Sequence, residues 1–125
     1  MSFLYDTEQE IEDVVRGFED CTTPGDDFHH REHLVVAVYY LQTLSRGDAV
    51  AKMRDALLRF LAHHGEDIQK YSEEVTVFWI DQAAARLQGM AVDASLADKC
   101  NQVITALVGV KSPTRTPAAR VEGEG

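Results

Sequence analysis

The five histidines of this chain fall in two short clusters, and they are the residues with the clearest capacity for chemistry. His29, His30 and His33 lie in one segment, and His63 and His64 are adjacent in another. Imidazole titrates near neutral pH and binds transition metals, so a histidine cluster can carry protons or hold a metal ion. The fold decides whether the two clusters can act together.

His33 lies four residues after His29 and three after His30. Either pair can share one face of a helix, because residues three or four apart are neighbours there. Helical bundles complete metal sites with side chains from facing helices, and the third ligand could be His63, His64, Glu73 or Glu74. The hypothesis is a divalent transition-metal site, and zinc, iron, manganese and nickel all suit such nitrogen and oxygen donors. If the site hydrolyses a substrate, a metal-bound water would be the nucleophile. The sequence assigns no catalytic residue and no substrate.

A pocket is expected beside these ligands, lined by His63, Tyr71, Ser72 and Trp79. Neighbours on a helix diverge by about 100°, so His63 and His64 cannot both face inward. Two other interpretations stay open. The histidines could be ordinary helix-end residues, or they could line a polar pocket that holds no metal.

The periodicity of the chain predicts an all-α fold, an antiparallel bundle of about five helices. The expected helices run from Glu8 to Asp20, from about His30 to Leu44, from an Asp48 cap to His64, from a Ser72 cap to Gly89, and from a Ser95 cap to about Leu107. Thr7 is the expected cap of the first helix, and Gly65 follows the third as a C-terminal glycine would. The segment from Leu34 to Leu41 is apolar nearly all round, which predicts the buried central helix. A β-strand is the competing interpretation, because the run is rich in β-branched residues.

Short connections should make consecutive helices antiparallel neighbours. The end of the first helix, the start of the second, the end of the third and the start of the fourth would then share one end of the bundle. Both histidine clusters lie at these helix ends, and so do Tyr71, Ser72 and Glu73. The candidate site is therefore expected at that end.

Composition narrows the classes of function. A chain of 125 residues with a net charge of −9 and no basic run is a poor candidate for binding nucleic acid or an anionic membrane. It has no signal-peptide pattern and no apolar stretch long enough to span a bilayer, so a cytoplasmic location is expected. Residues 1–110 should form one domain, and residues 111–125, with their prolines and glycines, should be a disordered tail.

The two cysteines, Cys21 and Cys100, do not form a metal-type Cys-x-x-Cys pair. Cys21 could supply a thiolate nucleophile, but no neighbouring motif orients it. The chain also lacks a glycine-rich phosphate-binding loop. The histidine clusters therefore remain the leading candidates for a site.

The segment from Phe28 to Leu34 resembles a Phe-x-His-x-x-His-Leu pattern found in a family of small, uncharacterised, all-helical bacterial proteins. In that family a Tyr-His-Glu-Thr-like segment follows later, where this chain has Tyr71-Ser72-Glu73-Glu74. The resemblance covers about half of the chain, from Phe28 to Trp79. It implies no particular activity.

By this resemblance, His30, His33, Tyr71 and Glu73 are the residues to single out. Ser72 departs from the pattern, which has histidine there. If that histidine is a ligand in the family, a metal site in this chain would be weakened or absent.

Two classes of function follow from the sequence. The first is a helical protein that binds a divalent metal or a small ligand in a pocket lined by histidine and glutamate. The second is a non-catalytic interaction or structural module, most simply a homodimer. The stretch Ala83-Ala84-Ala85 would allow close approach of a partner at the fourth and fifth helices.

Overall fold

The structure, a computed structural model, describes residues 5–91, 93–107 and 110. These residues form five α-helices and two 3-10 turns and no β-strand, which confirms the all-α prediction. The elements in chain order are α1 (Glu8–Glu19), η1 (Gly25–Asp27), α2 (His30–Leu41), α3 (Arg46–His63), η2 (Ile68–Lys70), α4 (Glu73–Gln88) and α5 (Leu96–Leu107). The expected tail, residues 111–125, lies outside the described residues.

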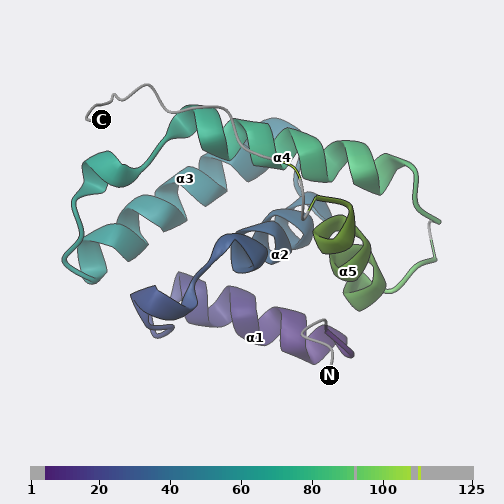
Figure 1. Ribbon diagram of the computed structural model, residues 1–125, viewed down its shortest axis with the longest axis horizontal. Helices are drawn as coiled ribbons and strands as arrows, with labels where there is room; N and C mark the ends of the chain where they lie inside the picture. Colours follow the sequence, from purple (N-terminus) through teal and green to yellow (C-terminus); the bar gives the residue numbers. More distant parts are fainter. Residues whose placement is uncertain (1–4, 92, 108–109, 111–125) are drawn as a thin grey trace.

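Helix α2 lies at the centre of the fold and packs against each of the other four helices (Figure 1). Its apolar run is enclosed, and Leu34, Val35, Val36 and Val38 are at most 1% exposed. Burying a side chain of this size contributes roughly 1.5–3 kcal/mol, which outweighs the weak preference of β-branched residues for strands. The segment is therefore a buried helix, and the strand alternative was wrong.

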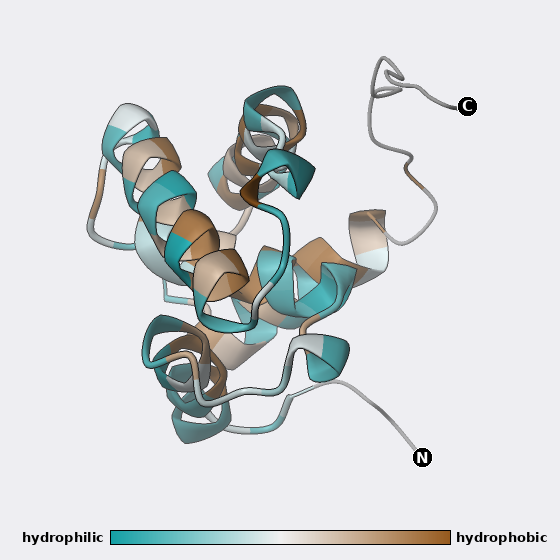
Figure 2. Cartoon of the chain, turned by 90° about the vertical axis from the view of Figure 1, so that its left-hand side faces the viewer, coloured by the Kyte–Doolittle hydropathy of each residue, from teal (hydrophilic) through white to brown (hydrophobic). Residues whose placement is uncertain are grey.

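The outer helices are amphipathic, and hydrophobic and hydrophilic positions share each of them (Figure 2). Helix α1 turns Ile11, Val15 and Phe18 toward the core, and each is at most 3% exposed. The hydroxyl of Tyr40 in α2 donates a hydrogen bond of 2.6 Å to the carboxylate of Glu19 in α1. Apolar burial and this polar contact together fix α1 against the central helix.

The ends of the helices are set mostly by the residues that the sequence indicates. Thr7 caps α1 in a capping box with Glu10, and Gly65 follows α3 with a positive φ of 72°. Helix α3 begins earlier than expected, because the Ser45 hydroxyl, rather than Asp48, caps it by accepting from the Asp48 amide.

Helix α2 ends at Leu41 rather than Leu44. The backbone amides of Gln42 and Thr43 each donate to a carbonyl three residues earlier, which tightens the chain into a turn. A 3-10 pattern of this kind commonly ends an α-helix.

Replacing Thr7 with alanine should lower the free energy of unfolding by about 1 kcal/mol, because the substitution leaves an amide of the first turn without its cap. Urea unfolding followed by circular dichroism measures this loss. Thr105→Ala, at an exposed position inside α5, is the matched control and should change stability by less than about 0.5 kcal/mol. Equal losses in the two variants would contradict the role of Thr7 as a cap.

Four helix ends gather on one side of the molecule, at the left in Figure 1. These are the end of α1, the start of α2, the end of α3 and the start of α4, and both 3-10 turns lie on the same side. Gly25 of η1 and His64 at the end of α3 line one common cavity. The fold thus brings the loops that carry both histidine clusters to one end.

The large hydrophobic side chains described on α4 and α5 are buried or half-buried. Among the described residues Ile68 of η2 is the one large hydrophobic side chain classed as exposed, at 53%. Ala83 is buried inside the fold, whereas Ala85 is exposed. A homodimer through these helices stays a prediction, and light scattering at high concentration tests it.

Both cysteines are free thiols and both are buried. Burial raises the pKa of Cys100 to about 12, so this thiol stays protonated at neutral pH. Cys21 follows the C-terminal cap of α1 in a left-handed backbone conformation, with a φ of 62°. No described helix combines the length and the apolar character needed to cross a bilayer.

Candidate functional site

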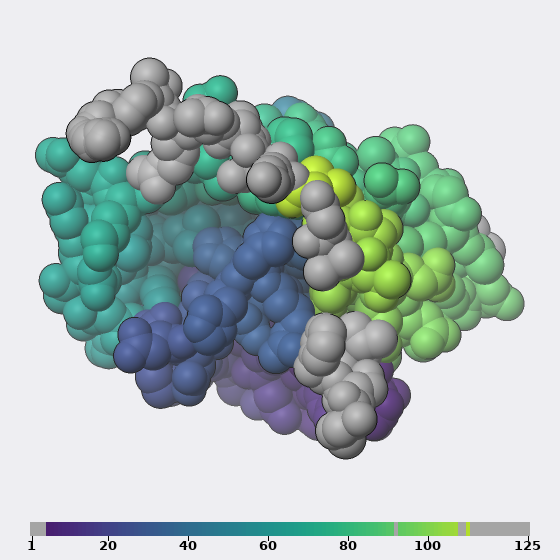
Figure 3. Space-filling model, viewed as in Figure 1, coloured from purple at the N-terminus to yellow at the C-terminus, as the bar shows by residue number. Residues whose placement is uncertain are grey.

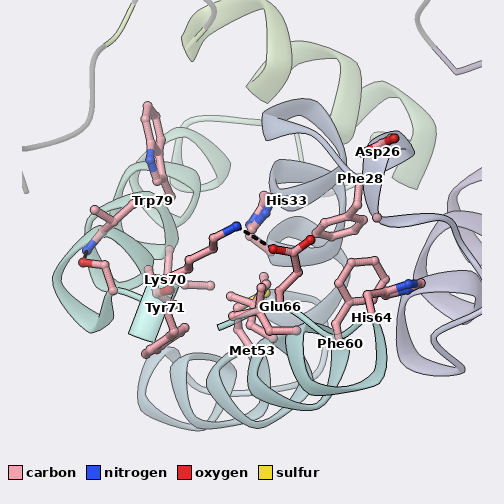
Figure 4. A pocket seen from close by; sticks show the side chains of 18 residues that line it. Asp26, Phe28, His33, Met53, Phe60, His64, Glu66, Lys70, Tyr71 and Trp79 are labelled. Atoms are coloured by element: carbon pink, nitrogen blue, oxygen red, sulfur yellow. Dashed lines mark hydrogen bonds and ion pairs between the residues drawn. The ribbon is translucent and has the colours of Figure 1, made fainter. Parts of the chain in front are cut away.

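A cavity of about 340 Å³ lies at the shared helix ends. The surface is hollowed between the residues around the start of α2, in blue, and those around η2 and α4, in teal (Figure 3). The apolar wall includes Phe28, Met53, Leu57, Phe60, Trp79 and Ile80. The polar and charged lining includes Asp26, His33, His64, Glu66, Lys70, Tyr71, Ser72 and Thr76 (Figure 4).

Phe28 joins three elements at one side of the cavity. Its ring stacks on Phe18 of α1 at 4.3 Å between centroids and lies 5.2 Å from Phe60 of α3. The ring of His33 in α2 is 4.6 Å from Phe28. Aromatic pairs at such distances add to the free energy of simple burial, so this cluster holds the η1 loop against the helices and fixes the position of His33.

His33 is an uncharged polar group in this wall at neutral pH. Burial, and to a smaller extent the nearby His30, lower the pKa of His33 to about 4, and Glu32 partly opposes the change. A neutral imidazole has one nitrogen that donates and one that accepts a hydrogen bond. His33 can therefore bind either kind of polar group on a ligand without placing a charge in the apolar wall.

His30 lies outside the lining of the cavity. Its ring packs edge-on against Trp79, with 4.3 Å between the centroids. Burial lowers the pKa of His30 as well. The side chain covers the indole that forms part of the cavity wall, so His30 supports the wall.

Glu73 is also absent from the lining, because it has partners elsewhere. Its carboxylate accepts from Arg54 of α3 at 3.1 Å and from the Tyr71 hydroxyl at 2.6 Å. Burial, with this hydrogen bond as a further cause, raises the pKa of Tyr71 to about 12. Glu73 thus ties the start of α4 to α3 and orients Tyr71, which does line the cavity.

The described residues contain no group of three histidine, cysteine, aspartate or glutamate side chains placed to hold a metal ion. His30 faces Trp79 and Glu73 faces Arg54, so the fold does not assemble the expected ligand set of His30, His33 and Glu73.

The second histidine cluster contributes His64 to the cavity, whereas His63 is exposed and does not line it. The sequence analysis expected His63 in the pocket, and the structure places His64 on the lining instead. His64 packs against Phe60 at 4.4 Å between centroids. Its Nε2 is buried and has no hydrogen-bond partner within the described chain, an uncommon state for a buried polar atom.

Of the expected pocket residues, Tyr71, Ser72 and Trp79 line the cavity, together with His33. Sequence reasoning missed four of its charged and polar members, which are Asp26, Glu66, Lys70 and Thr76. The aromatic members Phe28 and Phe60 could have been found, because Phe28 directly precedes the first histidine cluster. For the ion pair between Glu66 and Lys70, the spacing of four residues was the one feature of the sequence that could have predicted it.

No family model, curated protein or solved structure matches this chain. Its class rests on the fold and the site: a small all-α protein with an amphipathic, aromatic-walled cavity at the shared ends of four helices.

Proposed function

We propose that this protein binds a small, mainly apolar molecule in the cavity at the shared helix ends. The observation that carries the proposal is the lining itself, in which aromatic and aliphatic walls from α2, α3 and α4 surround a few polar groups. Ligand pockets in proteins typically have volumes of about 300–1,000 Å³ and this same mixture of walls. A cavity of about 340 Å³ lies at the small end of that range.

The polar groups would orient the ligand, and the apolar walls would supply most of the binding energy. His33 offers one hydrogen bond of either kind, because it is neutral near pH 7. Thr76 and Tyr71 lie on the same lining. Phe28 and Phe60 would cover the apolar part of the ligand and exclude water from it.

Trp79 provides a direct readout, because it is the only tryptophan of the chain and it lines the cavity. Titration with 1-octanol, a neutral probe with an apolar chain, should change the Trp79 emission saturably and should raise the midpoint of thermal unfolding. If emission and unfolding midpoint stay unchanged up to the solubility limit of octanol, the proposal is wrong.

A matched pair of variants locates the binding. Val75→Phe adds volume at a residue that lines the cavity, whereas Val77→Phe adds the same volume on the same helix away from the lining. We expect Val75→Phe to weaken octanol binding at least about tenfold, because the added ring occupies ligand space. Val77→Phe should bind octanol within about twofold of the parent protein. Equal affinities of the two variants would place the binding elsewhere.

A further inference from the structure

The lining of the cavity carries more carboxylate groups than ammonium groups. Asp26 and Glu66 each bring a carboxylate, and Lys70 brings one ammonium group. Lys70 and Glu66 form an exposed ion pair in which both side chains also line the cavity, and Figure 4 shows them reaching toward each other. With Lys70 paired to Glu66, the carboxylate of Asp26 leaves the lining with a net negative charge.

The walls beside these charges also favour a cation. The rings of Phe28, Phe60, Tyr71 and Trp79 line the cavity, and the face of an aromatic ring attracts an ammonium group that is withdrawn from water. The neutral ring of His33 can accept a hydrogen bond from an ammonium group without repelling it. The chain as a whole, at −9, adds a long-range field of the same sign.

We propose that the ligand is a cationic amphiphile, and this inference rests on the proposed function. The ligand would be a hydrophobic amine whose apolar part fills the aromatic cavity and whose ammonium group pairs with Glu66. The ligand would take the place of Lys70 on Glu66, and the Lys70 side chain would turn to water. An exposed ion pair is a weak interaction, so its exchange for a partner next to the aromatic walls is favourable. An anionic ligand would instead pair with Lys70, separate Glu66 from its partner and face the remaining carboxylates.

Three probes with the same octyl chain separate these cases: octylamine, 1-octanol and octanoate, titrated at pH 7 and low salt and followed by Trp79 emission. Octylamine should bind at least about fivefold more tightly than octanol, and octanoate more weakly than octanol. The advantage of the amine should shrink as salt is added, because salt screens exposed charges.

Two variants test whether Glu66 is the residue that pairs with the ammonium group of the ligand. Glu66→Gln should weaken octylamine binding several-fold and leave octanol binding unchanged, whereas Lys70→Gln should strengthen octylamine binding by freeing Glu66 from its lysine. Asp67→Asn is the matched control, since it removes one negative charge next to Glu66 at an exposed residue that does not line the cavity. It should retain most of the preference for the amine.

The outcomes distinguish this inference from the proposed function. Octanoate binding as tightly as octylamine, or Glu66→Gln acting no more strongly than Asp67→Asn, would overturn the inference. Octanol binding as tightly as the amine would overturn it too while supporting the proposed function. If none of the three probes binds, both proposals are wrong.

Discussion

Replacing Phe18 with alanine should lower the free energy of unfolding by about 3–5 kcal/mol. Phe18 is fully buried in α1 and its ring contacts Phe28 at 4.3 Å and Phe60 at 5.4 Å. The substitution removes a large apolar side chain and leaves a void that close-packed neighbours fill only in part. A loss of this size is a large fraction of the stability of a domain of this length.

Urea unfolding followed by circular dichroism measures the loss for Phe18→Ala. Phe78→Ala is the matched control, because Phe78 is a half-buried phenylalanine on α4 whose ring contacts Trp79 rather than the cluster around Phe28. We expect its effect to be about half as large or less, in keeping with its partial burial. Comparable losses would show that the ring of Phe18 is not a main support of the fold.

The Phe18→Ala variant should also change the cavity. Phe28 would lose its stacked partner, and the η1 loop that Phe28 holds would lose part of its support. We therefore expect weaker octanol binding in this variant even under conditions where it stays folded.

The second large effect is a dependence of stability on pH that arises from His33. The pKa of His33 is about 4 in the folded protein and near 6.5 when unfolded. Between these values the unfolded state binds a proton that the folded state does not, so stability falls as the pH decreases from about 6.5 to 4. At 1.36 kcal/mol per pKa unit, this group accounts for a loss of about 3 kcal/mol.

The measurement is the free energy of unfolding at several pH values between 7 and 4 for the parent protein and for His33→Gln. Carboxylates also titrate in this range, but both proteins carry the same ones, so the difference between the two curves reports His33 and its interactions with His30 and Glu32. The difference should change by about 3 kcal/mol across the range. Parallel curves would show that His33 is not held neutral by the fold.

His63→Gln is the matched control for this experiment. It removes an imidazole as well, but from an exposed residue near the same end of the fold. The contrast between the two variants therefore separates the effect of burial from the loss of one titratable ring. Ligand binding gives a second test, since His33→Gln keeps a polar group at the wall and should weaken octylamine binding less than Glu66→Gln does.

The sequence located the helices with good accuracy because their signals are local. Thr7, Ser72 and Gly65 each act within one turn of the backbone, through a hydrogen bond or a permitted φ. The apolar run around Leu34–Val38 likewise identified the central helix, because a helix that is hydrophobic on all sides has to be buried. The errors at Asp48 and Leu44 were shifts of a few residues, at ends where more than one local arrangement is available.

The candidate site was predicted less completely, because a helix-end residue can turn toward several neighbours. The sequence placed both histidine clusters near one cavity, and His33, Tyr71, Ser72 and Trp79 do line it. It could not show that Glu73 is held by Arg54, nineteen residues away on another helix. Nor could it show that His64 rather than His63 faces inward, since that depends on the rotation of the last turn of α3 against its neighbours.

The sequence by itself thus determined an all-α chain, its central helix and the end of the fold where histidines and aromatic residues meet. The tertiary structure decided which side chains share the cavity and which are held by other partners. The physical reason is that helix formation depends on local periodicity and caps, whereas a binding wall depends on the angles and rotations at which helices pack. Where the sequence suggested a metal site, the packing of the helices forms an aromatic cavity with His33 in its wall and Glu66 and Lys70 on its lining.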